Sequence, residues 1–409
     1  MPSRRFEEQK WLLDTVIETI GLDWDQLRRV NTLNVAGLDA GSDYDWISGA
    51  VTRFDEMSPA FATAAGRRRA RAQAAEKDGN LVTARESYFI AAVFYGWAQW
   101  PLHDRPERNA ELNALKIECY GRYAALAQRR VERADIPFGD HVVPGWLHLP
   151  QGVEGPHPVV VMVPGMDTFK ELQVAMYGDK FLERGFAVLT IDGPGHSEAV
   201  VNGLHITPGN FGDAGSAVLD WIEQHDDLDS DRVGVYGRSF GSYAAAVFAS
   251  ANADRLRGVA VALVIHEPGL RTLMDGSSPS FKARFMFMAG YDDEAEFDEF
   301  VQGFDLAPRA ASITCPLLIL AGEIDQLSPV EHSYRLARQV GGPVDMVVYE
   351  AERHAIGRSE AAKAGPHWYV TAADWLRARV IEGDAPTGRR LTFVTRSGVV
   401  EDRSAELAP

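Results

Sequence analysis

The chain has 409 residues, of which 46% are apolar and 24% charged, so it can bury a large core and is too long for one small module. Its formal net charge of −17 disfavours functions that depend on long-range attraction to nucleic acid or to an anionic membrane surface. Nearly all of the acidic excess falls after residue 138, which suggests that the chain holds two units.

The start of the chain and its cysteines favour a cytoplasmic protein. Charges interrupt every apolar stretch of residues 1–22, which therefore lack the apolar region of a signal peptide and predict an amphipathic helix. No run approaches the roughly 20 apolar residues of a membrane span. Cys119 and Cys315 lie far apart in the sequence, which argues against a disulfide framework and favours a reducing compartment.

Residues from about 60 to 133 have a helical pattern. Apolar residues recur at steps of three and four from Leu81 to Tyr95, Pro101 ends this run, and a second stripe extends from Leu112 to Leu126. The pattern predicts two antiparallel helices that resemble one tetratricopeptide unit, but no second copy is visible and a solenoid is not expected. We assign residues 1–138 to an N-terminal helical cap domain.

After residue 139 the pattern changes to short apolar runs separated by helical stretches. This alternation predicts a mostly parallel sheet covered by helices on both faces, a doubly wound α/β domain over residues 139–383. The predicted strands are 141–149, 159–163, 186–192, 233–237, 259–264, 316–320 and 345–349, and the predicted helices are 171–184, 211–225, 240–251 and 363–382. The long interval after the fifth of these strands predicts an inserted lid at about 266–312. Residues 384–409 give no clear signal and are assigned to a C-terminal tail.

The most specific motif is Gly-Arg-Ser-Phe-Gly at residues 237–241, directly after a predicted strand and directly before a predicted helix. This is the context of a nucleophile elbow, in which a strained turn exposes the serine hydroxyl above the sheet and small flanking residues avoid clashes. The motif alone is also compatible with a glycine-rich turn. The sequence of strand, elbow and helix favours Ser239 as a nucleophile.

A serine nucleophile needs a base and an acid that orients the base, and later strands end in both. Asp325 and His354 follow Ser239 in that order, each at the carboxyl end of a predicted strand, where open α/β sheets place their sites. Glu323 is the alternative acid, although it lies close to the strand. His332 and His367 are predicted to be ordinary surface histidines.

The developing oxyanion needs two fixed donors, which backbone amides can supply. We expect the N–H groups of Phe240, directly after the nucleophile, and of Met166, in the loop after the strand 159–163. Gly165 would let this loop approach closely, although a plain strand-to-helix turn would use similar residues. The loop 192–197 is expected to pack against the elbow, with His196 as a second base the less favoured alternative.

Together these features resemble a serine α/β-hydrolase. More narrowly, the chain resembles the group with an N-terminal helical domain that includes 2,6-dihydroxypseudooxynicotine hydrolase and fungal hydrolases that shorten pigment polyketides. The resemblance covers roughly residues 60–382. It rests on the segments YFIAAVFYGWAQ, PGMDTFKE, DGPGHSE, GRSFG, AGEID and ERHAIG.

The resemblance implies an α/β-hydrolase fold with a helical cap and a lid. It also implies hydrolysis of a carbon–carbon bond beside a ketone, or of an ester, in an aromatic or polyketide-like small molecule. By the same resemblance Asp167 is the nearest match to an auxiliary acid beside the oxyanion loop. A helix N-cap, or a structural carboxylate paired with Thr168 or Lys170, is the alternative interpretation of Asp167.

No metal or organic cofactor is expected. A plain carboxylesterase or an acyltransferase with the same triad is the first alternative, and a non-catalytic hydrolase-like binding protein is the second. We expect a small-molecule substrate, no nucleic-acid or membrane partner, and a homodimer.

Overall fold

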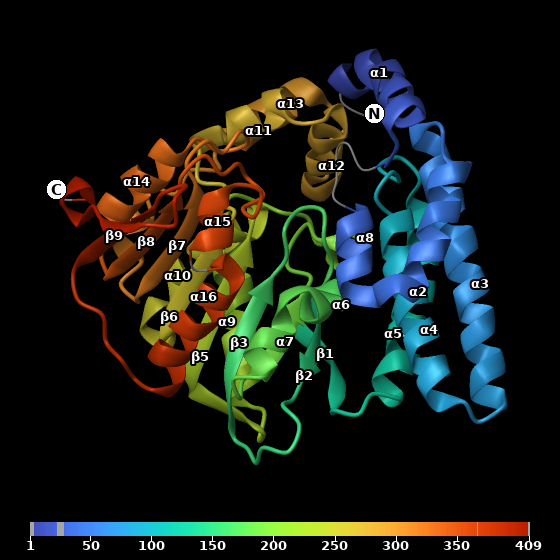
Figure 1. Cartoon of the computed structure of the whole chain (residues 1–409), viewed down its shortest axis with the longest axis horizontal. Helices are drawn as coiled ribbons and strands as arrows, with labels where there is room; N and C mark the ends of the chain where they lie inside the picture. The colour runs from blue at the N-terminus through green and yellow to red at the C-terminus, as the bar shows by residue number, and fades with distance from the viewer. Residues whose placement is uncertain (1–3, 23–27, 366, 408–409) are drawn as a thin grey trace.

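The computed structural model describes residues 4–22, 28–365 and 367–407. Within these residues one sheet runs through the molecule in the order β1-β2-β4-β3-β5-β6-β7-β8-β9-β10 (Figure 1). The neighbours from β4 to β9 pair in parallel, whereas β1 and β2, β2 and β4, and β9 and β10 pair antiparallel. The strands are β1 Val131–Phe138, β2 His141–His148, β3 His157–Val163, β4 Ala187–Ile191, β5 Leu228–Arg238, β6 Gly258–Ala262, β7 Leu317–Gly322, β8 Val344–Tyr349, β9 Arg389–Val394 and β10 Val400–Asp402.

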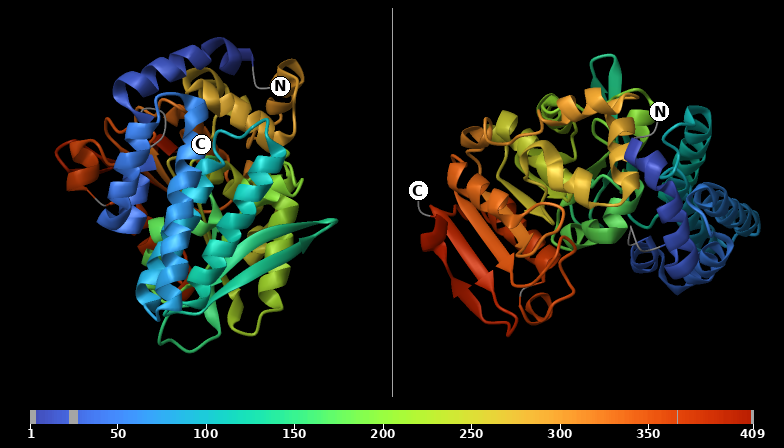
Figure 2. Two further views of the ribbon diagram at one scale, coloured as in Figure 1. Left: turned by 90° about the vertical axis from the view of Figure 1, so that its right-hand side faces the viewer. Right: turned by 90° about the horizontal axis from the view of Figure 1, so that it is seen from above.

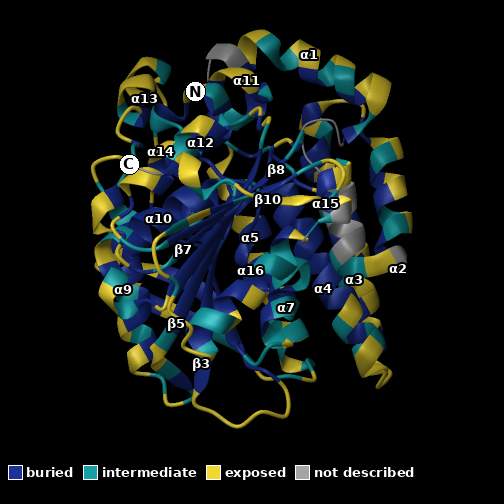
Figure 3. Cartoon of the chain, turned by 60° about the vertical axis from the view of Figure 1, so that its left-hand side comes forward, coloured by how far each residue is buried: buried dark blue, intermediate teal, exposed yellow. Residues whose placement is uncertain are grey.

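Helices cover both faces of this sheet, which explains why its central strands are apolar throughout. In β3, Val159, Val161 and Val163 belong to one buried cluster, while Val160 and Met162 belong to another on the opposite face. The central strands are buried along their whole length (Figure 3). This two-sided burial is typical of parallel sheets. The predicted α/β-hydrolase fold class, with a mostly parallel sheet, is confirmed.

The helices that follow the first parallel strands are short. Those from β3 onward, outside the lid, are α6 Lys170–Gln173, α7 Asp179–Leu182, α8 Ser197–Val201, α9 Asn210–Glu223, α10 Phe240–Asn252, α14 Val330–Gln339, α15 Glu360–Ala364 and α16 Trp368–Leu376. The predicted helix at 171–184 is interrupted by a π-helical turn at Val174–Gly178. The one predicted at 363–382 begins only at Trp368, because α15 ends at Ala364, and it ends in a second π-helical turn at Arg377–Ile381.

The N-terminal helices pack beside the sheet, in front of it in the left view of Figure 2. They are α1 Arg4–Ile20, α2 Arg28–Ala50, α3 Met57–Lys77, α4 Leu81–Ala98 and α5 Pro106–Ala125. We call these helices the cap. Helix α4 lies between α3 and α5 and is buried on almost every side over its second half. A Cβ atom at Gly96 would lie 2.1 Å from the ring of Phe169, so the cap touches the loop after β3 directly.

A second group of helices, which we call the lid, lies along the upper end of the sheet in Figure 1. The lid consists of α11 Arg271–Gly276, α12 Pro279–Ala289 and α13 Glu294–Val301, between β6 and β7. Helix α1 of the cap packs against α12 of the lid. No helix in the described ranges is both long and apolar enough to cross a membrane.

Four elements differ from the sequence prediction. Residues 131–138, assigned to the helical unit, form strand β1, and residues 389–394 and 400–402, assigned to a tail, form β9 and β10. These strands lie at or near the two edges of the sheet and carry charged residues on their exposed positions, so they lack the apolar run that marks a central strand. Helix α2, which bends at Gly37 where φ is 67°, was not predicted.

Candidate active site

The nucleophile elbow has the geometry that its glycines suggest. Ser239 links β5 to α10 with φ 55° and ψ −126°, a backbone conformation that residues other than glycine rarely adopt. A Cβ atom at Gly237 would lie 2.2 Å from the carbonyl oxygen of Gly241, and one at Gly241 would lie 2.5 Å from that of Val163. Larger residues at either position would therefore force the turn apart. The elbow is held in the sheet by the N–H of Ser239, which donates to the carbonyl of Ala262 at 3.0 Å.

The structure brings Ser239, His354 and Asp325 together in one hydrogen-bonded chain. Ser239 Oγ lies 2.9 Å from His354 Nε2, and His354 Nδ1 lies 2.8 Å from Asp325 Oδ2. The other oxygen of Asp325 accepts the N–H groups of Leu327 at 2.8 Å and Ser328 at 3.1 Å. Because Asp325 can only accept from Nδ1, the arrangement favours the tautomer whose Nε2 accepts the serine proton.

The alternative residues lie elsewhere. Glu323 accepts the N–H of Ala351 at 2.9 Å and so fixes the loop that leads to His354, instead of bonding to the imidazole. His332 lies 3.9 Å from Glu267, and the ring of His367 packs on Tyr369 at 4.2 Å between ring centres. None of the three belongs to the chain of hydrogen bonds at Ser239.

The loop after β3 passes directly beside the nucleophile. A Cβ atom at Gly165 would lie 3.3 Å from the Cβ of Ser239 and 3.2 Å from the carbonyl of Arg238, so a larger side chain would push the loop away. Met166 is buried in this loop, and Phe240 is the first residue of α10. Phe240 therefore lies next to Ser239 along the chain, and Met166 lies next to Gly165, which approaches Ser239 closely. These are the two residues expected to form the oxyanion hole.

Asp167 has a different neighbour from those expected. Its Oδ1 lies 3.9 Å from Nη2 of Arg238, the residue before the nucleophile, and about a fifth of its side chain is exposed. The hydroxyl of Thr168 donates to the carbonyl of Gly165, and Lys170 contacts other carboxylates. Phe169 is the residue before α6, so Asp167 is not its N-cap. The two alternative interpretations, a pairing of Asp167 with Thr168 or Lys170 and an N-cap role, are therefore wrong.

A cluster of buried charges that was not predicted from the sequence supports this loop. Lys170 Nζ lies 2.7 Å from Glu171, 3.1 Å from Asp192 and 2.6 Å from Glu198, and the side chain of Lys170 is completely buried. Although burial alone would lower the pKa of Lys170, these carboxylates raise it above its ordinary value. Burial also opposes ionisation of Glu198, but Lys170 and Arg133 outweigh it and lower the pKa of Glu198 to about 2.

The cap contributes a second lysine to this cluster. Lys116 of α5 is completely buried, donates to the hydroxyl of Ser197 at 2.5 Å and lies 3.6 Å from Glu171. Burial lowers the pKa of Lys116 from its ordinary value. The loop after β3, the loop after β4 and helix α5 are thus tied together. Asp192, directly after the buried strand β4, was the signal for this cluster in the sequence.

His196 packs against the elbow and has no catalytic partner among the described residues. Its Nδ1 lies 3.2 Å from the carbonyl of Pro194, and its ring stacks on Phe240 with 6.0 Å between ring centres. Complete burial lowers the pKa of His196 to about 4, so the ring is neutral at pH 7. The lid covers Phe240, because the ring of Phe285 in α12 meets that of Phe240 edge to face with 4.6 Å between ring centres. In the described part of the chain, no group of three or more His, Cys, Asp or Glu side chains is arranged to hold a metal ion.

Comparisons with known proteins agree with this architecture. A family model described as "Esterase FrsA-like" matches residues 62–275, and one described as "Prolyl oligopeptidase family" matches residues 176–381. An alpha/beta hydrolase, ucsC, of an Acremonium species is 29% identical over 267 residues, which are 60% of this chain and 52% of that protein. The 2,6-dihydropseudooxynicotine hydrolase of Paenarthrobacter nicotinovorans is 32% identical over 163 residues, 40% of this chain and 43% of that protein. The chain thus spans about half the length of these two relatives.

A solved structure supports the fold. The crystal structure of the 2,6-dihydroxy-pseudo-oxynicotine hydrolase superposes with a TM-score of 0.74 at 24% identity, covering 88% of this chain and 99% of that one. The parallel sheet, the elbow and these similarities define a serine α/β-hydrolase, an enzyme. Within this class the chain belongs to the FrsA-like esterase family, whose model matches just over half of it.

Proposed function

We propose that this hydrolase cleaves a carbon–carbon bond beside a ketone, or an ester, in an aromatic or polyketide-like small molecule. The observation that carries the proposal is the unbroken chain of hydrogen bonds from Ser239 through His354 to Asp325. The name of the 2,6-dihydropseudooxynicotine hydrolase relative supports a small-molecule substrate.

In the proposed mechanism His354 takes the proton of Ser239 as the oxygen attacks the substrate carbonyl. Asp325 stabilises the imidazolium that results, and the N–H groups of Phe240 and Met166 hold the oxyanion. When the intermediate collapses, the carbonyl re-forms and the bond to the leaving group breaks. An alkoxide leaves with the proton from His354. Water, activated by the same histidine, then releases the acid from Ser239.

A carbon leaving group needs a proton on carbon as it departs, and we assign this step to Asp167 as an auxiliary acid. A Cβ atom at Gly165 would lie 3.3 Å both from Asp167 Oδ1 and from the Cβ of Ser239, and this shared closeness to Gly165 supports the assignment. In this route the proton that His354 took from Ser239 returns through solvent to the Asp167 carboxylate before His354 activates water, and the net reaction adds the elements of water: the acyl carbon receives hydroxyl and the departing carbon receives hydrogen.

The proposal is tested with aryl esters and 1,3-diketones whose products are identified by mass spectrometry. Asp167→Asn should reduce cleavage of the diketone by about 100-fold, within the usual range for general acid catalysis, and cleavage of an activated aryl ester by less than about 3-fold, because a phenolate leaves without a proton. Asp275→Asn, at an exposed lid position, is the control. Equal losses on both substrates would show that Asp167 is structural.

A plain carboxylesterase or an acyltransferase is the second candidate, because the matched family model is that of an esterase. Turnover of esters alone, with no diketone cleaved by the wild-type enzyme, would favour an esterase. Transfer of the acyl group to an added alcohol would identify an acyltransferase. We further propose a cytoplasmic homodimer, which fractionation of the source cells and light scattering of the purified protein would test.

A further inference from the structure

Arg284, in the lid helix α12, is a buried cation with two nitrogen donors that are not used. Only 6% of the residue is exposed, and its Nε and Nη1 atoms have no hydrogen-bond partner among the described residues. No carboxylate of the described ranges forms an ion pair with it. Burying an unpaired cation is costly, so a group of this kind is retained only where something outside the resting protein repays the cost.

Aromatic rings and distant charges surround this guanidinium. It lies 5.6 Å from the ring centre of Trp100, at the end of the cap helix α4, and 5.1 Å from that of Phe287 in its own helix. Asp192 and Asp167 act on it electrostatically, but Asp192 is bonded to Lys170 and Asp167 lies beside Arg238. Burial lowers the pKa of Arg284 to about 10, so the group remains charged at pH 7.

Arg284 also lies in the part of the lid helix α12 that packs beside the nucleophile elbow. The following residue, Phe285, packs on Phe240 directly after Ser239. The field of Arg284 reaches His196 and His103, two buried histidines whose pKa values burial lowers to about 4 and about 3. Both rings are therefore neutral at pH 7. The space between the cap, the lid and the elbow thus holds an uncompensated positive charge.

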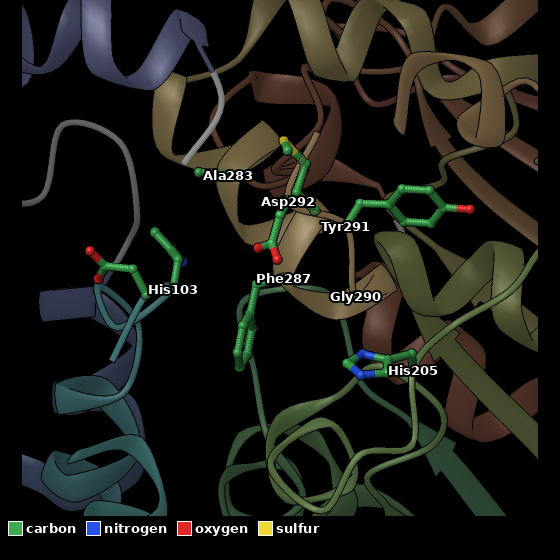
Figure 4. Close-up of a pocket in the computed structure, with 9 residues that line it drawn as sticks. His103, His205, Ala283, Phe287, Gly290, Tyr291 and Asp292 are labelled. Atoms are coloured by element: carbon green, nitrogen blue, oxygen red, sulfur yellow. The ribbon is translucent and has the colours of Figure 1, made fainter. Parts of the chain in front are cut away.

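A cavity connects this region with the surface. It has a volume of about 280 Å³ and lies between the cap loop at His103 and Asp104 and the lid segment from Ala283 to Asp292. In Figure 4, His103 lies on the cap side of this cavity, and Phe287 and Asp292 lie on the lid side. Arg284 itself does not line this cavity, but the preceding residue Ala283 does, and the ring of Phe287, which also lines it, lies 5.1 Å from the guanidinium.

We propose that Arg284 binds a carboxylate of the substrate, so that this hydrolase acts on anionic small molecules. The inference rests on the proposed hydrolase function and names its substrate class. A carboxylate supplies the counter-ion that the guanidinium lacks, and charge-assisted hydrogen bonds are strongest where water is excluded. Neutral esters and ketones of the same shape leave the cation unpaired and are poorer substrates.

The test compares 4-nitrophenyl half-esters of succinic, glutaric and adipic acids with the neutral esters of equal chain length. The wild-type enzyme should prefer one of the half-esters over its neutral partner. In Arg284→Met this preference, as a ratio of kcat/KM values, should fall about 30-fold, mainly through KM, in keeping with one charge-assisted contact. The preference of Arg284→Lys, which keeps the charge, should lie between those of the wild type and of Arg284→Met. Arg271→Met, whose side chain is 84% exposed in the lid helix α11, should leave the ratio unchanged.

Thermal unfolding separates a binding role from a structural one. Removal of an unpaired buried charge should raise the Tm of Arg284→Met above that of the wild type. An unchanged preference in Arg284→Met, or a lower Tm together with equal losses on both ester classes, would overturn the inference.

A binding measurement needs no turnover, so it tests the carboxylate site independently of the proposed function. A non-hydrolysable anilide of the preferred diacid is titrated by calorimetry into Ser239→Ala and into the same variant carrying Arg284→Met. Weaker binding by the double variant supports the carboxylate site, and equal binding contradicts it. Failure of the folded wild type to cleave any of these esters or the 1,3-diketones would contradict the proposed function instead.

Discussion

The two sides of Ser239 are held in place in different ways. On one side, Asp325 and His354 follow the neighbouring strands β7 and β8, and a single carboxylate with backbone donors orients the imidazole. On the other side, the loop carrying Met166 and Asp167 is supported by a cluster of completely buried charges that includes Lys116 from the cap.

This difference shows which parts of the site depend on the cap. Parallel strands bring their carboxyl ends to one edge of the sheet, so the triad side is positioned by the sheet itself. The loop after β3 is positioned by ion pairs that also involve the loop after β4 and helix α5. Loss of the cap is therefore expected to disturb the oxyanion side before the triad side.

The largest expected effect is at the nucleophile. Ser239→Ala should reduce turnover of an aryl ester by about 10⁴-fold to 10⁶-fold, since the covalent step is lost while binding is kept. Circular dichroism and thermal unfolding should match the wild type, because the change only removes a hydroxyl at the elbow. Substantial turnover by a folded Ser239→Ala protein would remove the triad from the mechanism.

The next effect separates Asp325 from Glu323. Asp325→Asn should lower kcat by about 10⁴-fold, because an amide favours the wrong imidazole tautomer. Glu323→Gln should change kcat by less than about 10-fold, since that side chain contacts the backbone of Ala351 and not the imidazole. Steady-state kinetics on one aryl ester decide between them, and a reversed order would identify Glu323 as the acid.

The buried cluster can be broken without touching the triad. Lys170→Met should lower the free energy of unfolding by about 3–5 kcal/mol, because Asp192 and Glu198 would lose a buried partner. Lys363→Met is the matched control, since its pair with Glu360 is exposed and should contribute less than about 1 kcal/mol. Urea denaturation measures both. Equal free energies of unfolding for Lys170→Met and Lys363→Met would mean that the cluster does not support the loop.

The smallest effect is the dependence of stability on pH. His196 has a folded pKa of about 4, below its ordinary value of 6.5, because it is buried. The unfolded chain therefore binds more protons between these values, and the stability present above pH 6.5 is lost as the pH falls toward 4, by up to about 1.4 kcal/mol per pH unit. Glu198 adds a second loss between its ordinary pKa of 4.5 and its folded value of about 2.

Urea denaturation between pH 7 and pH 4.5 measures this slope. His196→Gln should flatten it, whereas His141→Gln, at an exposed position in β2, should not. Other buried histidines such as His103 contribute to the same slope, so His196→Gln removes only its own share. A slope that stays the same in His196→Gln would show that this ring does not titrate on unfolding.

The elbow and the strand ends could be predicted from the sequence because each depends on residues close together in the chain. The order of apolar strand, small residue, serine, small residue and helix determines the turn at Ser239 locally. Strands β1 and β9 could not be predicted in the same way. Each gains its place by pairing with a neighbour at or near the edge of the sheet, so its side chains need not be apolar.

The contacts of Asp167 and Lys116 show the same limit. Asp167 meets Arg238 because the loop after β3 crosses the end of β5, and Lys116 reaches Ser197 across 81 positions of the sequence. Nothing in the local pattern of either residue identifies its partner. The unpaired state of Arg284 is likewise visible only when every neighbouring side chain is in place.

The sequence by itself determined the class of fold, the elbow at Ser239 and the strand ends at which Asp325 and His354 lie. It could do so because the alternation of strands and helices and the demands of a tight turn are local properties of the chain. Only the tertiary structure decided which charges are buried together, how the cap and lid close over Phe240, and that Arg284 is left without a counter-ion. These features depend on desolvation and on distances between remote segments, which no short stretch of sequence specifies.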